Sequence, residues 1–251
     1  MRRLPAWIAW LVLGVTSPAS SQRSPAATFG VDVRPTVGFR AGNVVRVSYS
    51  LRLTSTARDS LSNFAVLSPV PVRVVTAPVA LAGSMLLGTR EGERDAARWS
   101  FLVAMPRNRQ SVGALAYEAI GLPGIVHYRA RRHVPVREAG PRDLIDEPPP
   151  LQFDVADRDQ IVGATIGVVK MPTDQTPAGL AAWLRGQLTQ ACALGWINTP
   201  ETCDRLLAAF DARGARALAG KLDAERGAHV NENAYILLTT AMASLVSHGS
   251  H

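Results

Sequence analysis

The chain has 251 residues, of which 47% are hydrophobic and 19% are charged, a balance typical of globular proteins that excludes an intrinsically disordered chain. Its length allows one large domain or two of ordinary size. The formal net charge is +7 at pH 7, but the six basic and six acidic side chains after Gln175 balance, so the surplus of positive charge belongs to the first part of the chain.

The first 21 residues have the three regions of a signal peptide. Arg2 and Arg3 precede an apolar run from Leu4 to Val15, and small residues follow at Ala19 to Ser21. The run of twelve residues is well short of the roughly 20 that a membrane-spanning helix needs. We therefore expect a secreted or periplasmic protein without a transmembrane segment once the signal peptide is removed. An uncleaved anchor or a buried N-terminal helix is the alternative.

Residues 22–137 are expected to form an all-β antiparallel sandwich of the immunoglobulin or fibronectin type, although the Cys…Trp…Cys signature is absent. In the clearest strand, Val45–Leu53, apolar side chains alternate with Arg46, Ser48, Ser50 and Arg52, which predicts one buried and one exposed face. Further strand patterns lie between turn signals, with no intervening helix: Phe29–Val33, Asn63–Leu67, Val72–Thr76, Ser84–Thr89, Arg98–Met105, Ser111–Glu118 and Ile125–Arg131.

A linker or connector is expected over residues 138–175. Gly140-Pro141 and the three prolines at 148–150 favour an extended, semi-rigid spacer. Ile161–Val169 is either a last strand of the sandwich or part of the connector.

Residues 176–247 are expected to form a small all-α module of four helices, followed by a flexible tail at 248–251. Thr176-Pro177 and Thr199-Pro200 are helix-start signals. Two later helices are predicted, a short one around Arg216–Asp223 and a last one that starts near Asn231.

Cys192 and Cys203, the two cysteines of the chain, are predicted to form a disulfide that joins the first two helices of this module. An isolated pair this close in an exported protein favours a structural bridge. The spacing is not Cys-x-x-Cys, so a redox-active pair is the weaker alternative.

The helical segment resembles the FIMAH domain, a small helical module at the C-termini of exported bacterial proteins. The resemblance implies an exported accessory module and no particular activity, and this chain is shorter between Phe210 and Leu222. The similar stretches are Leu194-Gly195-Trp196-Ile197, Leu206-Leu207, the run from Asp223 to Val230, and Ala234-Tyr235-Ile236-Leu237-Leu238.

The first module is similar to uncharacterised β-sandwich proteins exported by bacteria, on the stretch from Gly121 to Ala130. This resemblance implies the same compartment and names no substrate.

The main candidate binding residues are basic. If Ile125 to Val136 is one extended strand, its alternation places His127, Arg129, Arg131 and His133 on one face. Arg46 and Arg52 point outward from Val45–Leu53, so neighbouring strands would form one platform for carboxylate, sulfate or phosphate groups. The alternative is an ordinary solvated face whose arginines deter edge pairing.

Other candidate sites are weaker. His229 is expected to cap or pack at the entry to the last helix, and His248 and His251 belong to the tail. Asp154, Asp157 and Asp159, near Asp146 and Glu147, lack the glycine of a calcium loop and are expected to form a solvated acidic surface. No catalytic motif is recognisable, and we expect neither a metal nor another cofactor.

The leading hypothesis is a non-enzymatic interaction protein of the bacterial envelope or exterior. Its expected partners are anionic polysaccharide, lipid head groups or an envelope protein. Nucleic acid is not expected, because the aromatic residues of the strands mostly fall on core-facing positions. The alternatives are a hydrolase of envelope polymers that uses acids between Asp143 and Asp159, and a structural subunit whose sandwich edge accepts a partner strand.

Overall fold

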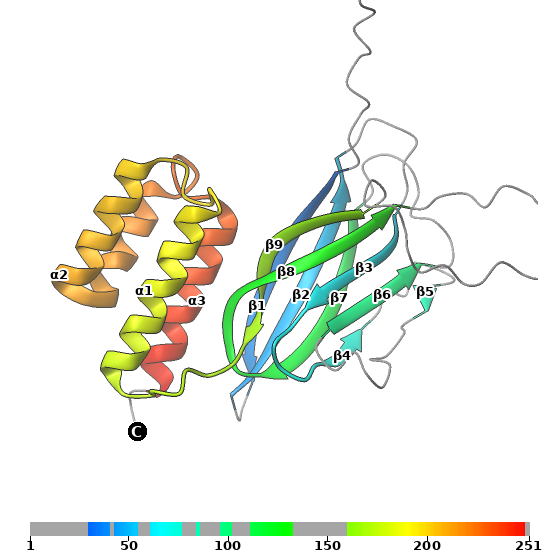
Figure 1. The fold of residues 1–251 in the computed structure, drawn as a ribbon, viewed down its shortest axis with the longest axis horizontal. Coiled ribbons are helices and arrows are strands. Elements are labelled where there is room, and N and C mark those ends of the chain that lie inside the picture. Colours follow the sequence, from blue (N-terminus) through cyan, green and yellow to red (C-terminus); the bar gives the residue numbers. More distant parts are fainter. Residues whose placement is uncertain are drawn as a thin grey trace, which may run out of the picture.

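The computed structural model describes residues 30–40, 43–54, 61–76, 84–85, 96–101, 111–132 and 160–248. Two antiparallel β-sheets pack face to face, and a helical module lies beside them (Figure 1). The predicted signal peptide, the proline-rich linker at 138–150 and the end of the tail at 249–251 lie outside the described residues.

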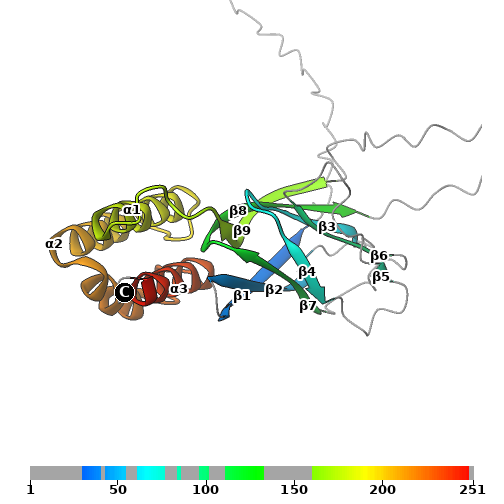
Figure 2. The same ribbon diagram turned by 90° about the horizontal axis from the view of Figure 1, so that it is seen from below.

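The two sheets are called sheet A and sheet B. Sheet A has the strand order β1-β2-β7-β4, and sheet B has the order β5-β6-β3-β8-β9. They form the two layers that Figure 2 shows from another side. The strands are β1 (Val31–Arg40), β2 (Val44–Leu53), β3 (Leu61–Leu67), β4 (Arg73–Thr76), β5 (Ser84–Met85), β6 (Ala96–Phe101), β7 (Ser111–Ile120), β8 (Leu122–Arg132) and β9 (Gln160–Val169).

The core between the sheets is aromatic at its centre. Tyr49 of β2 packs against Phe64, Trp99 and Tyr117, with ring centroids 5.7 to 6.2 Å apart. The apolar positions of β2 predicted from alternation are all buried, while Arg52 is exposed. The prediction of an antiparallel sandwich is therefore confirmed at the level of two packed sheets.

The stretch Ile161–Val169 is a strand and not a connector. It belongs to β9, which pairs with β8 from Leu122↔Val169 to Arg131↔Gln160. Glycines allow this pairing to be close, because a Cβ on Gly163 would lie 2.5 Å from the ring of Tyr128. A Cβ on Gly167 would also overlap Val126 and the hydroxyl of Tyr117. Residues that follow the long segment 133–159 thus complete sheet B.

The helical module contains α1 (Pro177–Ala193), α2 (Pro200–Glu225) and α3 (Glu232–His248). The hydroxyl of Thr176 accepts a hydrogen bond from the N–H of Gly179, and that of Thr199 from the N–H of Thr202, both at 3.2 Å. These are the N-caps that the two Thr-Pro pairs predict. The separate short helix predicted at Arg216–Asp223 is found as the second part of α2, beyond a break at Gly214.

The end of α1 is set by Gly195, whose φ of 69° suits a residue without a side chain. The N–H of Gly195 donates to the carbonyl of Cys192, and that of Trp196 donates to the carbonyl of Ala191. This pair of bonds is the Schellman arrangement that ends a helix. It turns the chain so that Ile197 pairs with Val230, next to the start of α3.

The helices pack directly on the sandwich. Ile125 of β8 and Ile166 of β9 are cross-strand partners, and both are buried in the same cluster as the helix residues Leu184 and Leu237. The side-chain oxygen of Gln187 in α1 accepts a hydrogen bond from the N–H of Ile125 at 3.0 Å. The two modules therefore share a continuous apolar contact.

The predicted disulfide between Cys192 and Cys203 is confirmed. It joins the last turn of α1 to the first turn of α2, and the two Cα atoms are 6.0 Å apart. A disulfide of this kind is consistent with an oxidising compartment. Among the helices that the structure describes, none combines the length and apolarity required to cross a bilayer.

Reduction of the Cys192–Cys203 disulfide is expected to lower the free energy of unfolding by about 2–3 kcal/mol, because the bridge restricts a short loop of the unfolded chain. Urea unfolding with and without dithiothreitol, followed by circular dichroism, measures this difference. A Cys192→Ser/Cys203→Ser variant should match the reduced chain and ignore dithiothreitol. A midpoint that does not move on reduction contradicts the prediction.

Candidate functional site

The second half of β8 carries the candidate basic residues on one face. His127 and Arg129 are exposed and Arg131 is half-buried, whereas Tyr128 and Ala130 between them are buried in the core. The outward face of β8 is thus divided. Ile125 is covered by the helices, and the basic residues begin two positions later. His133 lies outside the described residues.

The neighbouring strands extend this basic surface. Arg129 lies opposite Ala65 of β3 on one side and Val162 of β9 on the other. Arg98 of β6 is in turn the cross-strand partner of Ala65. Sheet spacings place the Cα atoms of Arg98 and Arg129 about 10 Å apart, and those of Arg129 and Arg131 about 7 Å apart. We call His127, Arg129, Arg131 and Arg98 the basic face.

The charge of sheet B is of one sign. Its described strands contain four arginines and one histidine, all on β6 and β8, and no aspartate or glutamate. Within the part of the chain that the structure describes, no carboxylate forms an ion pair with Arg129 or Arg131.

Arg46 and Arg52 do not join the basic face, because a shared platform required β2 and β8 to be neighbouring strands and they are not. They lie on β2, which pairs with β1 and β7 in sheet A, whereas β8 pairs with β3 and β9 in sheet B. The core separates the outward faces of the two sheets, so these arginines are on the opposite side of the sandwich.

The arginines of sheet A also have acidic neighbours. A carboxylate oxygen of Glu118 lies 3.1 Å from Nε of Arg40 and 3.9 Å from a terminal nitrogen of Arg46. Arg52 is the cross-strand partner of Asp32. The carboxylate of Asp32 forms an ion pair with Arg34 at 2.9 Å. Basic residues on this side thus belong to a surface with both signs of charge.

The free edge of β9 is held by side chains from other strands. The hydroxyl of Tyr49 donates to the carbonyl of Ile166 at 2.8 Å, and that of Tyr117 accepts from the N–H of Val168 at 3.0 Å. The hydroxyl of Ser68 donates to the carbonyl of Val168 at 3.2 Å. These backbone groups are therefore not available to a strand from a partner.

The edge of β1 is interrupted by a proline. The N–H of Thr54 donates to the carbonyl of Gly30, and the antiparallel alternation then directs the backbone polar groups of Val33 and Pro35 away from β2. Pro35 has no N–H to offer, which is a common way to keep an edge strand from pairing. Neither β1 nor β9 offers a continuous edge for strand addition.

A cleft of about 410 Å³ lies between β1 and the first turn of α3. Residues 32–35 form one wall, and residues 231–233 with Ile236 form the other. Both of its carboxylates are in ion pairs, Asp32 with Arg34 and Glu232 with Arg226. The cleft thus presents a largely neutralised lining, in contrast to the basic face.

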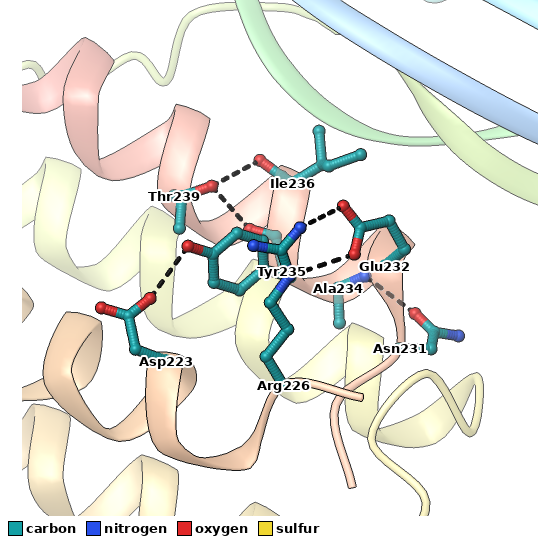
Figure 3. Close-up of polar contacts among 8 residues, drawn as sticks. All are labelled: Asp223, Arg226, Asn231, Glu232, Ala234, Tyr235, Ile236 and Thr239. Carbon is teal, nitrogen blue, oxygen red and sulfur yellow. Dashed lines mark hydrogen bonds and ion pairs between the residues drawn. The ribbon is translucent and has the colours of Figure 1, made fainter. Parts of the chain in front are cut away.

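The polar cluster beside this cleft joins α2 to α3 (Figure 3). Arg226 forms an ion pair with Glu232 at 2.7 Å, and this hydrogen-bonded contact raises the pKa of Arg226. The Cζ atom of Arg226 also lies 3.9 Å from the ring centroid of Tyr235. The hydroxyl of Tyr235 donates to Asp223 at 2.8 Å, and this bond raises the pKa of Tyr235. The charged groups of this cluster pair with one another, as expected of contacts that hold the end of α2 against α3.

The remaining candidate residues have local roles or lie elsewhere. His229 sits before α3, as predicted, and its Nδ1 is 3.0 Å from the side-chain oxygen of Asn198. The acidic residues between Asp143 and Asp159 lie outside the described residues. Within the described parts, no group of three or more His, Cys, Asp or Glu residues is arranged to hold a metal ion.

No protein-family model matches this chain, and no curated protein matches it.

The hydrogen bonds of the buried Tyr49 and Tyr117 to β9 can be tested through the dependence of stability on pH. Burial raises the pKa of Tyr117 to about 12 and that of Tyr49 well above its ordinary value. The unfolded chain releases these protons near pH 10 and the folded chain retains them, so the free energy of unfolding should fall as the pH rises from about 10 to about 12.

Tyr117→Phe should weaken this alkaline dependence and also destabilise the protein by about 1–3 kcal/mol at neutral pH, because it leaves the N–H of Val168 without its partner. Urea unfolding at a series of pH values measures both effects. Equal stability of the variant and the original chain at neutral pH would rule out the proposed bond.

Proposed function

We propose that this chain is an exported, non-enzymatic interaction protein whose basic face binds anionic groups on an envelope or extracellular partner. The observation that carries the proposal is the one-signed charge of sheet B, which holds four arginines, one histidine and no acid on its described strands. Sheet A mixes arginines with Glu118 and Asp32, so the asymmetry is a property of one face and not of the whole sandwich.

Guanidinium groups suit this role chemically. Each presents several N–H donors in a planar fork that matches carboxylate, sulfate and phosphate oxygens. Arg129 and Arg131 are two residues apart on one strand and therefore point to the same side. Two such groups can engage neighbouring anionic groups of one partner at the same time.

The compartment and the modules support the same proposal. The predicted signal peptide and the disulfide agree with an oxidising space outside the cytoplasm. An immunoglobulin-like arrangement is supported by the placement of β3, β8 and β9 in one sheet and of β1, β2 and β7 in the other. In this proposal, the FIMAH-like helices act as an accessory or attachment unit.

The double variant Arg129→Ala/Arg131→Ala is expected to lose at least about tenfold in affinity for the isolated envelope fraction of the host, because two charge-assisted contacts are removed. Co-sedimentation of residues 22–251 at low and high salt measures this. Binding by the original chain should weaken as salt rises.

The matched control is Arg34→Ala/Arg52→Ala, which removes the same charge from the outward face of sheet A. It should bind like the original chain. Equal losses in the two double variants would indicate a general charge effect and contradict a specific role for sheet B. If the original chain does not sediment at any salt concentration, the proposal is wrong.

A further inference from the structure

Two exposed apolar side chains lie at the same end of the sandwich. Phe39 is 47% exposed at the end of β1, and Ile120 is 67% exposed at the end of β7. Among the described residues, the other exposed large apolar side chains are Val162 of β9 and Leu194 at the end of α1. Single exposed apolar side chains are common on protein surfaces, so the proximity of Phe39 and Ile120 is the feature that calls for a partner.

Strand β2 brings these two residues close to each other. Its residue Val45 is the cross-strand partner both of Phe39 and of Ala119, which directly precedes Ile120. Two strand spacings place the Cα atoms of Phe39 and Ala119 about 10 Å apart. Figure 1 shows the ends of β1 and β7 together at the lower end of the sandwich. We call Phe39 and Ile120 the apolar tip.

Backbone contacts hold the turns beside the apolar tip. The N–H of Gly121 donates to the carbonyl of Asn43 at 3.3 Å, which joins the turn between β7 and β8 to the turn before β2. A Cβ on Gly121 would overlap the carbonyl oxygen of Val169, so the first of these turns also packs closely on the end of β9. The apolar tip is therefore presented by an end of the sandwich that is already ordered.

Positive charge lies beside the apolar tip. Lys170 is exposed and directly follows β9, whose end pairs with the start of β8. Arg40 and Arg46 share the single carboxylate of Glu118, so one positive charge of this group is not neutralised even with both contacts formed. Apolar side chains with cations around them match a membrane that contains anionic lipids, whose acyl chains lie beneath negatively charged head groups.

We propose that the apolar tip is a membrane contact, in which Phe39 and Ile120 insert into the surface of an anionic bilayer. A protein partner fits less well, because a stable interface buries roughly 800 Å² on each side and two side chains supply only part of that area. The inference goes beyond the proposed function, since the basic face lies in the other half of β8. From Leu122 to Arg131 the strand rises by about 30 Å, so the tip and the basic face can be occupied at the same time.

The test measures co-sedimentation of residues 22–251 with vesicles of phosphatidylglycerol and phosphatidylethanolamine. Phe39→Ser/Ile120→Ser should weaken this binding at least about tenfold, because it removes the apolar surface that inserts. Vesicles of phosphatidylcholine should bind the original chain at least about threefold more weakly, because they carry no net charge. Val162→Ser/Leu194→Ser is the matched control, since it removes two exposed apolar side chains from other surfaces, and it should bind like the original chain.

A second measurement locates the contact through fluorescence. Ile120→Trp places a tryptophan at the tip, and Val162→Trp places one on the outward face of sheet B. Lipids brominated on their acyl chains should quench the added fluorescence of the first variant at least about twofold more than that of the second, because only the tip enters the bilayer. Ile120→Trp keeps a large apolar side chain, so it tests the contact even where the double serine variant does not fold.

The outcomes separate this inference from the proposed function. Arg129→Ala/Arg131→Ala should bind the vesicles like the original chain, and loss of vesicle binding in this variant alone would assign the lipid contact to the basic face and overturn the inference. Equal quenching of the two tryptophan variants, or no binding to the anionic vesicles, also overturns it and leaves the role of the basic face standing. Two apolar side chains bind a membrane weakly, so the tip does not replace the basic face in binding to the whole envelope fraction.

Discussion

The burial of Ile125 and Ile166 beneath the helices is the contact on which the arrangement of this protein depends. These cross-strand partners bring the outward face of sheet B into the apolar cluster of the helical module. Because side chains alternate along β8, the same face continues with His127 and Arg129 where the helices end. Strand β8 thus has three roles. Its inward residues belong to the core, the outward residue Ile125 contacts the helical module, and the outward residues from His127 onward belong to the basic face.

Strand β9 lies at one edge of sheet B, and side chains from sheet A hold it there. A strand at the end of a sheet normally leaves backbone groups open to other chains. Here the hydroxyls of Tyr49 and Tyr117 cross from sheet A to two of those groups on β9. The same tyrosines form part of the aromatic core. The closed edge of β9 therefore depends on side chains that belong to the core.

Much of the fold could be predicted because its signals are local. Alternation over Val45–Leu53 identified β2, two Thr-Pro pairs marked the starts of α1 and α2, and the spacing of Cys192 and Cys203 predicted the disulfide. The break at Gly214 was predicted as a gap between helices, because local pattern cannot tell a kink with positive φ from a loop. Ile161–Val169 stayed open between strand and connector, since its partner β8 lies beyond residues 133–159.

The site was predicted only in part, for a related reason. Period-two alternation assigns a residue to one face of its own strand, and it correctly placed His127 and Arg129 on the exposed side of β8. It does not say which strands are neighbours, so Arg46 and Arg52 could be joined to them only by assuming a pairing that the sheet order does not contain. Arg98 was missed because β6 is connected to β8 only through β3, and the three strands are far apart in the chain. The face on which a residue lies can be predicted from the alternation of its own strand, whereas a surface that several strands share depends on their pairing.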